Sequence, residues 1–274
     1  MSRKQIPMNR DIVAHGAYYE EDEKGFLINP TALPKPSSDW FDLMCDISEK
    51  LKVLFGTSLH SIYLRGSVAA SYAEKDLSDL DMFVVLFSDQ EMYWEPIPES
   101  EVWEKNCREQ FPFFHSLDLY KTAYSNNFKS DYPALASIIK TQSVCVYGAD
   151  VSLEIAPYKQ SNMKGIHLKW LRKDLDVFYK NDVDLNACSA MMKIVLRAAF
   201  DLVMEKDGRY TNSLYFCWRS FSEYYPEKEK DFQQALDWYL NPIAVKELLL
   251  SYLQRNGEWL YTEACRLQMI DTGE

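Results

Sequence analysis

Residues Leu64 to Phe87 read LRGSVAASYAEKDLSDLDMFVVLF, and in this segment a Gly-Ser pair is followed by two aspartates. The residues SIYLR at 61–65 predict a short strand, and Gly66-Ser67 after it predicts a tight turn. Such a turn lets backbone N–H groups approach an anion closely. The first part of the stretch therefore indicates an anion-binding loop at the end of a strand.

The second part places two carboxylates at the start of another strand. Asp79 and Asp81 open the apolar run at 82–87. Strand side chains alternate between faces, so residues two apart point the same way. Magnesium in proteins is usually held by one or two carboxylates together with substrate phosphates and water, and it relieves the repulsion between such groups. On its own, however, an Asp-x-Asp pair is most typical of a solvated strand end.

A third carboxylate strengthens the metal interpretation. Asp118 lies within SLDLY at 116–120, among residues typical of a half-buried strand. Because a buried, unpaired aspartate is costly, we expect this strand to lie beside the first and to bring Asp118 to Asp79 and Asp81. Three carboxylates that hold one or two metal ions indicate metal-assisted phosphoryl or nucleotidyl transfer.

The motif Gly66-Ser67, eleven residues, then Asp79-Leu80-Asp81 resembles that of the polymerase-β-like nucleotidyltransferases, especially the bacterial antibiotic adenylyltransferases of aminoglycoside-modifying type. In that family a third carboxylate comes from a later strand, and Asp118 matches it in order and spacing. The resemblance implies a magnesium-dependent enzyme with ATP as donor substrate.

The resemblance covers residues 60–150 well and the C-terminal half more loosely. The segment SVCVYGAD at 143–150 resembles the strand and turn that commonly close the catalytic domain. One departure lies at Ala70-Ser71, where many relatives have Arg-Gly. This departure bears on the local phosphate contacts and leaves the carboxylates as they are.

Length and composition favour a globular enzyme of two domains. The chain has 274 residues, of which 47% are hydrophobic and 26% are charged. We predict an α+β fold, in which a small mixed β-sheet nucleotidyltransferase domain at 1–155 precedes an all-helical bundle domain at 156–274. The first domain includes an N-terminal extension and a helix.

Hydrophobic periodicity places the elements of both halves. Ser38 is expected to cap a first helix that runs through Leu54. Strands are expected near 61–65, 79–87, 116–121 and 143–147. Helices are expected between them, near 68–73, 99–110 and 132–140. After a linker at 148–162, helices are expected near 163–180, 184–206, 210–224, 228–239 and 243–268.

Acidic residues are concentrated in the first half. Residues 1–155 hold 14 Lys and Arg against 24 Asp and Glu, a net charge of −10, whereas the remainder has a net charge of −1. A triphosphate bound to the first half therefore needs cations from elsewhere, which favours a site between the domains. A total charge of −11 without a basic tract disfavours nucleic acid as a partner and favours a cationic small molecule. Alternatively, the surplus acid only keeps the surface soluble.

In the helical half, residues 191–216 resemble the helix and turn that reach the nucleotide in the antibiotic adenylyltransferases. The resemblance implies that Arg197 and Arg209 contact the triphosphate, and we assign Lys193 and Tyr210 to the same nucleotide-binding set. Lys193 and Arg197 are four residues apart and so share one helix face. The alternative for this pair is a solvated helix face without a ligand.

Several classes of protein and site are disfavoured. No apolar run is long enough for a membrane span, and the N-terminal residues lack the apolar core of a signal peptide, so a cytoplasmic protein without a membrane partner is expected. The six cysteines are widely spaced, which favours free, buried thiols. The four histidines are equally scattered, and His115 is expected to pack or to form a local hydrogen bond.

The sequence thus predicts transfer of AMP from ATP to a hydroxyl group of a small acceptor, such as an aminoglycoside-like compound. Asp79 and Asp81 bind magnesium, Gly66 and Ser67 orient the phosphates, and Asp118 either binds metal or acts as the general base. Two alternatives stay open: nucleotidylation of a protein partner, as in antitoxin-type enzymes, and a degraded homologue that only binds nucleotide. The sequence does not specify the acceptor, the base preference or the oligomeric state.

Overall fold

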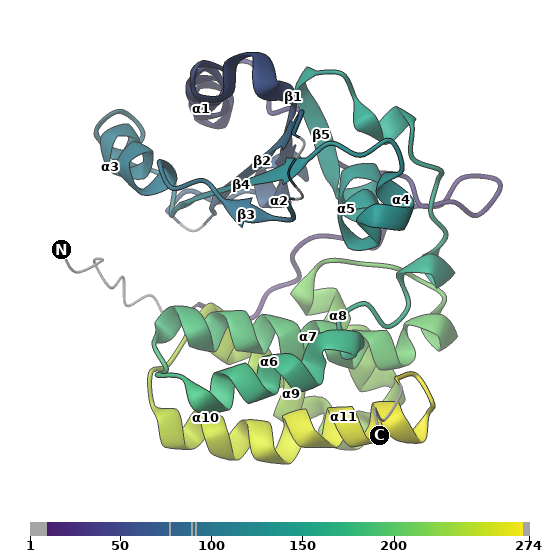
Figure 1. Cartoon of the computed structure of the whole chain (residues 1–274). Helices are drawn as coiled ribbons and strands as arrows, with labels where there is room; N and C mark the ends of the chain where they lie inside the picture. The colour runs from purple at the N-terminus through teal and green to yellow at the C-terminus, as the bar shows by residue number, and fades with distance from the viewer. Residues whose placement is uncertain (1–9, 77, 89, 91, 271–274) are drawn as a thin grey trace. The chain divides into compact units, whose positions relative to one another are not determined.

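The computed structural model describes residues 10–76, 78–88, 90 and 92–270. Contacts divide the chain into two compact units. The sheet unit is Glu20–Lys159, and the helical unit combines the residues up to Tyr19 with Gln160–Glu274. Figure 1 shows strands with flanking helices in the former and an array of helices in the latter. The predicted α+β class, with a mixed sheet before an all-helical part, is confirmed.

In the described part of the chain, the sheet has five strands in the order β3-β4-β2-β1-β5. The strands are β1 (Leu59–Arg65), β2 (Leu80–Leu86), β3 (Glu95–Pro96), β4 (Leu117–Ala123) and β5 (Ser143–Gly148). β2 and β4 are parallel, whereas the other neighbouring strands are antiparallel. A parallel pair requires a crossover, and helix α3 (Ser100–Gln110) lies in the connection between β2 and β4.

The register of this sheet fixes which side chains meet. Asp81 lies opposite Arg65 of β1 on one side and opposite Asp118 of β4 on the other. Residues directly opposite one another in neighbouring strands project from the same face. Three ionisable side chains therefore stand in a row across three strands.

The other face of the sheet is closed by apolar helices. Helix α1 (Asp39–Phe55) begins at Ser38, whose hydroxyl accepts the Phe41 N–H at 3.2 Å, so the predicted cap is confirmed. Leu43, Ile47 and Leu51 of α1 are fully buried in the same apolar cluster as alternate residues of β1 and β2. Figure 1 shows α1 and α3 on this side of the sheet. Burial of one face holds the strands in a single register.

Shorter helices complete the sheet unit. They are α2 (Gly66–Ala69), α4 (Phe128–Asp131) and α5 (Pro133–Gln142), with 3₁₀ turns η1 (Gly56–Ser58) and η2 (Val151–Leu153). The helix expected near 68–73 instead ends at Ala69, and Ser71 has a positive φ of 63° that helical backbone does not adopt.

The helical unit is organised around helix α7 (Leu185–Asp207), which packs against α6, α8 and α9. Asp184 caps the start of α7 by accepting the Ala187 N–H at 2.7 Å, and Gly208 ends it with a left-handed φ of 71°. The other elements are η3 (Gln160–Met163), α6 (Leu168–Lys180), α8 (Leu214–Tyr224), η4 (Pro226–Lys228), α9 (Glu229–Leu240), α10 (Lys246–Tyr252), η5 (Leu253–Gly257) and α11 (Glu258–Arg266).

The helix expected at 243–268 is interrupted. A π-helical turn, η5, separates α10 from α11. Gly257, at the end of this turn, lies close to α6, because a Cβ there would meet the Leu175 side chain at 2.8 Å. The periodicity of the sequence continues through the turn, which is why periodicity alone predicts one continuous helix.

The N-terminal segment packs with the helical unit. The Tyr19 N–H donates to the Tyr210 carbonyl at 2.8 Å, and the Thr211 hydroxyl donates to the Ala17 carbonyl at 2.7 Å. The described residues up to Tyr19 therefore group with 160–270, although the predicted domain at 1–155 includes them as an N-terminal extension. Division into folding domains at 1–155 and 156–274 stays a prediction, and residues 1–9 of the predicted extension lie outside the described residues.

All six cysteines are free, as predicted, and Cys107, Cys188 and Cys217 are buried. Burial is the main cause that raises the pKa of the Cys107 thiol, to about 11. Among the described helices, none combines the length and the apolar character that a membrane crossing requires.

A buried carboxylate holds the start of α6. Asp201 of α7 is 2% exposed and accepts the backbone N–H groups of His167 at 2.7 Å and Leu168 at 3.2 Å. His167, the residue before α6, forms no side-chain cap of its own. Asp201 thus satisfies donors that a helix start would otherwise leave unpaired.

We predict that Asp201→Ala lowers the free energy of unfolding of the helical unit by about 3 kcal/mol, because two N–H bonds to a charged group are lost inside the protein. The matched control is Glu205→Ala, one turn further along α7, which removes only an exposed ion pair with Lys164 and should change stability by less than about 1 kcal/mol. Denaturant unfolding followed by circular dichroism measures both variants. Equal effects would contradict the assigned role of Asp201.

Candidate active site

The candidate site begins at the turn after β1. Gly66 has a left-handed φ of 73°, and a Cβ built on it would lie 2.1 Å from the Asp81 Oδ2 atom. A side chain at this position would therefore collide with the carboxylate. The turn brings the backbone of Gly66 directly against Asp81, as the Gly-Ser and Asp-x-Asp motifs together predict.

Asp81 and Asp118 form the centre of the site. They are directly opposite each other in the parallel strands β2 and β4. The charges of both carboxylates affect the pKa of Tyr120, which lies two residues after Asp118 on β4. Burial first, and then the charges of Asp118 and Asp81, raise the pKa of Tyr120 above its ordinary value, while Arg65 lowers it. The register places these two aspartates side by side, and the convergence of all three predicted carboxylates stays a prediction.

Asp79 lies just before β2 and is held by the loop before β4. Its Oδ1 atom accepts the Ser116 hydroxyl at 2.6 Å and lies 3.0 Å from the His115 Nδ1 atom. His115 was expected to pack or to form a local hydrogen bond, and its contact is instead with Asp79, 36 residues earlier in the chain. Asp79 and its neighbours thereby tie the loop before β4 to the start of β2.

Within the described ranges, no three or more His, Cys, Asp and Glu side chains are arranged to hold a metal ion. The three-carboxylate metal centre of Asp79, Asp81 and Asp118 therefore stays a prediction. The chemistry of the donors nevertheless fits magnesium, because two in-register carboxylates beside a glycine turn match its preference for one or two carboxylates plus phosphate oxygens.

An aromatic group adjoins the carboxylates on the same face of the sheet. Trp94 stacks on Tyr120 with ring centroids 5.0 Å apart, and the Arg65 guanidinium carbon lies 5.4 Å from the centroid of the Trp94 ring. Trp94 has a positive φ of 53°, which is an outlier for a bulky residue. We did not single out Trp94 or Arg65 from the sequence, although Arg65 directly precedes the Gly-Ser pair.

Two of the predicted nucleotide-binding residues already have partners in the helical unit. Arg209 donates to both oxygens of Asp207, at 2.6 and 2.9 Å, and its guanidinium carbon lies 4.2 Å from the Tyr18 ring centroid. Tyr210 is 4% exposed, its hydroxyl is bonded to Asn212, and burial raises its pKa well above the ordinary value. A nucleotide-binding role for Arg209 and Tyr210 stays a prediction.

Lys193 and Arg197 lie on α7, in the middle of the helical unit. Both are half-buried, and the alternative of a solvated helix face without a ligand stays open. The Arg197 Nε atom is buried and has no hydrogen-bond partner in the part of the chain that the structure describes. Their contact with a triphosphate also stays a prediction.

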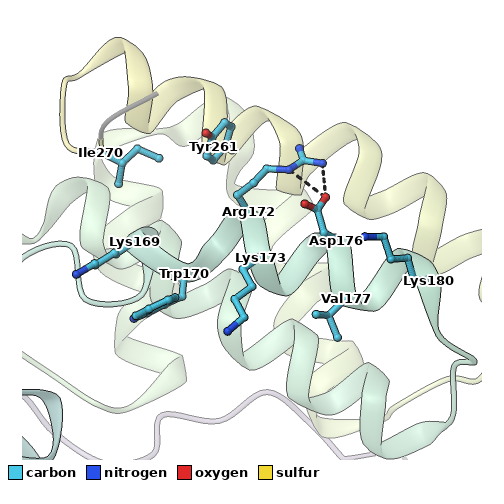
Figure 2. A pocket seen from close by; sticks show the side chains of 9 residues that line it. All are labelled: Lys169, Trp170, Arg172, Lys173, Asp176, Val177, Lys180, Tyr261 and Ile270. Carbon is cyan, nitrogen blue, oxygen red and sulfur yellow. Dashed lines mark hydrogen bonds and ion pairs between the residues drawn. The ribbon is translucent and has the colours of Figure 1, made fainter. Parts of the chain in front are cut away.

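A surface groove of about 520 Å³ lies on the helical unit along α6 (Figure 2). Lys169, Lys173 and Lys180 line it, and the ammonium groups of the first two lie 5.5 and 5.4 Å from the centroid of the exposed Trp170 ring. Among the described residues these lysines form no ion pair. None of the predicted site residues lines this groove, so the exposed Trp170 belongs to a cationic surface that we did not predict.

Comparison with protein-family models gave no match, and comparison with curated protein sequences gave none either. Among solved structures, the chain is similar to the spectinomycin adenyltransferase AAD(9) from Enterococcus faecialis, crystallised with ATP and spectinomycin. The two are 14% identical over 80% of this chain and 99% of that one, with a TM-score of 0.49. Because this similarity is weak, the functional inferences rest on the residues of the chain itself.

We predict that Gly66→Ala lowers the unfolding free energy of the sheet unit by more than the strain of a positive φ alone explains. The methyl group of the alanine must displace the Asp81 carboxylate, and the alanine backbone must adopt a positive φ. Gly208→Ala is the matched control, because its φ of 71° is similar and nothing lies within 4 Å of the added Cβ. The control should lose about 1–2 kcal/mol of unfolding free energy, and Gly66→Ala clearly more.

The double variant Gly66→Ala/Asp81→Ala identifies the cause. Removal of the carboxylate relieves the contacts at 2.1 and 2.9 Å and leaves only the Cβ of residue 81 at 3.3 Å, so Gly66→Ala should cost clearly less in the Asp81→Ala background than in the wild type. Additive effects of Gly66→Ala and Asp81→Ala, measured by denaturant unfolding, would show that the two residues do not contact each other.

Proposed function

We propose that the chain is a magnesium-dependent nucleotidyltransferase that transfers AMP from ATP to a hydroxyl group of a small acceptor. One observation carries the proposal: the Asp81 carboxylate occupies the space left by the missing side chain of Gly66 and stands in register with Asp118. This arrangement joins an anion-binding turn to a carboxylate pair. Metal-assisted phosphoryl or nucleotidyl transfer requires both.

Each residue of the site has a proposed role. Asp81 and Asp118, with Asp79, hold the metal, and Gly66 and Ser67 orient the phosphate chain of the donor. Magnesium, when bound, would neutralise charge on the phosphate oxygens and on the leaving pyrophosphate. The bonds from His115 and Ser116 to Asp79 keep that carboxylate in a fixed orientation.

The proposed reaction is a single displacement at phosphorus. The acceptor hydroxyl oxygen forms a bond to the α-phosphorus, and the bond between that phosphorus and the bridging oxygen breaks, so that pyrophosphate leaves with the bonding electron pair. The hydroxyl proton passes to a base. Asp118 is either this base or only a metal ligand, and the two roles predict different kinetics.

The acceptor class follows from charge. Residues 20–159 hold 12 Lys and Arg against 23 Asp and Glu, so their field attracts a cationic acceptor. We propose an amino sugar or a similar polyhydroxylated amine. As a further part of the proposal, Lys193, Arg197, Arg209 and Tyr210 of the helical unit contribute to the nucleotide site.

The test is incubation of the purified protein with radiolabelled ATP, magnesium and a panel of cationic and neutral polyhydroxylated compounds. We expect pyrophosphate release and a labelled small product that depend on both magnesium and a cationic acceptor. Label on a protein in added lysate would instead favour a protein acceptor. Nucleotide binding without any turnover would favour a module that only binds nucleotide.

Asp81→Asn should lower the transfer rate about 100-fold or more, the scale seen when one group that stabilises charge in the transition state is removed. Asp131→Asn is the charge-matched control in the same unit, since this exposed residue is bonded to Ser125 and belongs to no predicted site. An unchanged rate in Asp81→Asn, measured as pyrophosphate release, would contradict the proposal.

Asp118→Asn separates the two roles of its carboxylate. As a general base, Asp118 matters for chemistry only, so the variant should bind ATP with wild-type affinity and lose turnover. As a metal ligand it matters for both, and affinity should fall together with the rate. Isothermal titration with magnesium and a non-hydrolysable ATP analogue gives the affinity. Wild-type ATP affinity together with a wild-type turnover rate would show that Asp118 does not belong to the site.

A further inference from the structure

Arg65 occupies a distinctive position at the candidate site. It is the last residue of β1, lies opposite Asp81 and directly precedes Gly66. Asp81 in turn lies opposite Asp118 of β4, so the three side chains share one face of the sheet. Arg65 thus places a permanent positive charge at the end of the carboxylate row.

The guanidinium of Arg65 has donors that the protein does not use. Among the described residues, its buried Nε atom has no hydrogen-bond partner, and Arg65 forms no ion pair. Asp81, the nearest in register, is seated against Gly66. Buried donors are almost always paired in proteins, so an arginine in this state needs an explanation.

Arg108, the other arginine of residues 20–159, shows the usual situation. Its guanidinium also lies over an aromatic ring, with the carbon 4.9 Å from the Phe114 centroid, but it donates to Glu104 at 2.8 Å and to the Phe114 carbonyl at 3.1 Å. The unused donors of Arg65 are therefore a local feature and do not follow from residue type.

The surroundings hold Arg65 in place without neutralising it. The Trp94 ring contacts the guanidinium and is itself fixed between Tyr120 and Phe83, with centroids 5.0 and 5.3 Å away. An aromatic face attracts a guanidinium but leaves its N–H groups free for a planar, oxygen-bearing partner. Arg65 as a whole is only partly buried.

We infer that Arg65 is a phosphate-binding residue, whose guanidinium donates hydrogen bonds to the oxygens of the phosphate chain beside Asp81 and Asp118. The inference rests on the proposed function and deepens it. A triphosphate in a unit with 12 cationic and 23 anionic residues needs positive charge close by, and Arg65 supplies it from within the sheet. Trp94 keeps the guanidinium extended toward the phosphate.

The experiment compares two ligands on the full-length protein by isothermal titration: magnesium alone, and inorganic tripolyphosphate at saturating magnesium. Tripolyphosphate carries the phosphate chain without a base or sugar. Arg65→Gln removes the charge, and Arg65→Lys keeps it but loses the planar fork. Lys52→Gln is the control, because it removes one positive charge that lies 4.7 Å from the centroid of the Tyr147 ring, and Tyr147 pairs with Ile62, three residues before Arg65 in β1.

We expect Arg65→Gln to weaken tripolyphosphate binding roughly 10- to 100-fold, as for the loss of hydrogen bonds between charged groups. Arg65→Lys should recover part of the loss, and Lys52→Gln should bind as the wild type does. Magnesium affinity should stay equal or increase in Arg65→Gln, because a cation has been removed near the carboxylates. A residue that only supports the fold would instead lose magnesium affinity and thermal stability together, and that result would overturn the inference.

Failure of the inference can be told apart from failure of the proposed function. If the wild type binds magnesium tripolyphosphate, Asp81→Asn abolishes the binding and Arg65→Gln does not affect it, the inference is wrong and the proposed function stands. If the wild type binds neither ligand, the proposed function is wrong, and the inference is wrong with it.

Discussion

The candidate site depends on the absence of a side chain at position 66. A left-handed φ at Gly66 turns the chain sharply after β1, and the Asp81 carboxylate fills the space that a Cβ would need. The parallel register then brings Asp118 beside Asp81. Because the buried opposite face fixes this register, the helices α1 and α3 stabilise the site without contributing a residue to it.

Positive charge is the second requirement of a phosphate site in so acidic a unit. The sheet unit supplies Arg65, whose donors are unused, whereas Arg209 of the helical unit is already paired with Asp207. Arg197 resembles Arg65 in having a buried, unpaired Nε atom. Among the described residues, Arg65 and Arg197 thus each keep a buried donor that no protein atom accepts, whereas the Nε donor of Arg209 is used by Asp207.

Much of the fold follows from local sequence patterns. The cap at Ser38 and the positions of the longer strands were predictable because capping residues and alternating hydrophobicity are short-range signals. The pairing of Asp81 with Asp118 required only that the two strands be neighbours. Trp94 was not predictable, because its φ and its ring contacts come from tertiary packing around a strand of two residues. The same holds for residues 10–19, which are held by hydrogen bonds to distant parts of the chain.

The central claim is that the Asp81–Asp118 pair holds a divalent cation together with a nucleoside triphosphate. Its most direct test is anomalous diffraction from crystals grown with manganese and a non-hydrolysable ATP analogue, since manganese replaces magnesium and is visible by its anomalous signal. The account predicts an anomalous peak within bonding distance of both carboxylates and of phosphate oxygens. A fully occupied analogue whose metal contacts neither Asp81 nor Asp118 would contradict it.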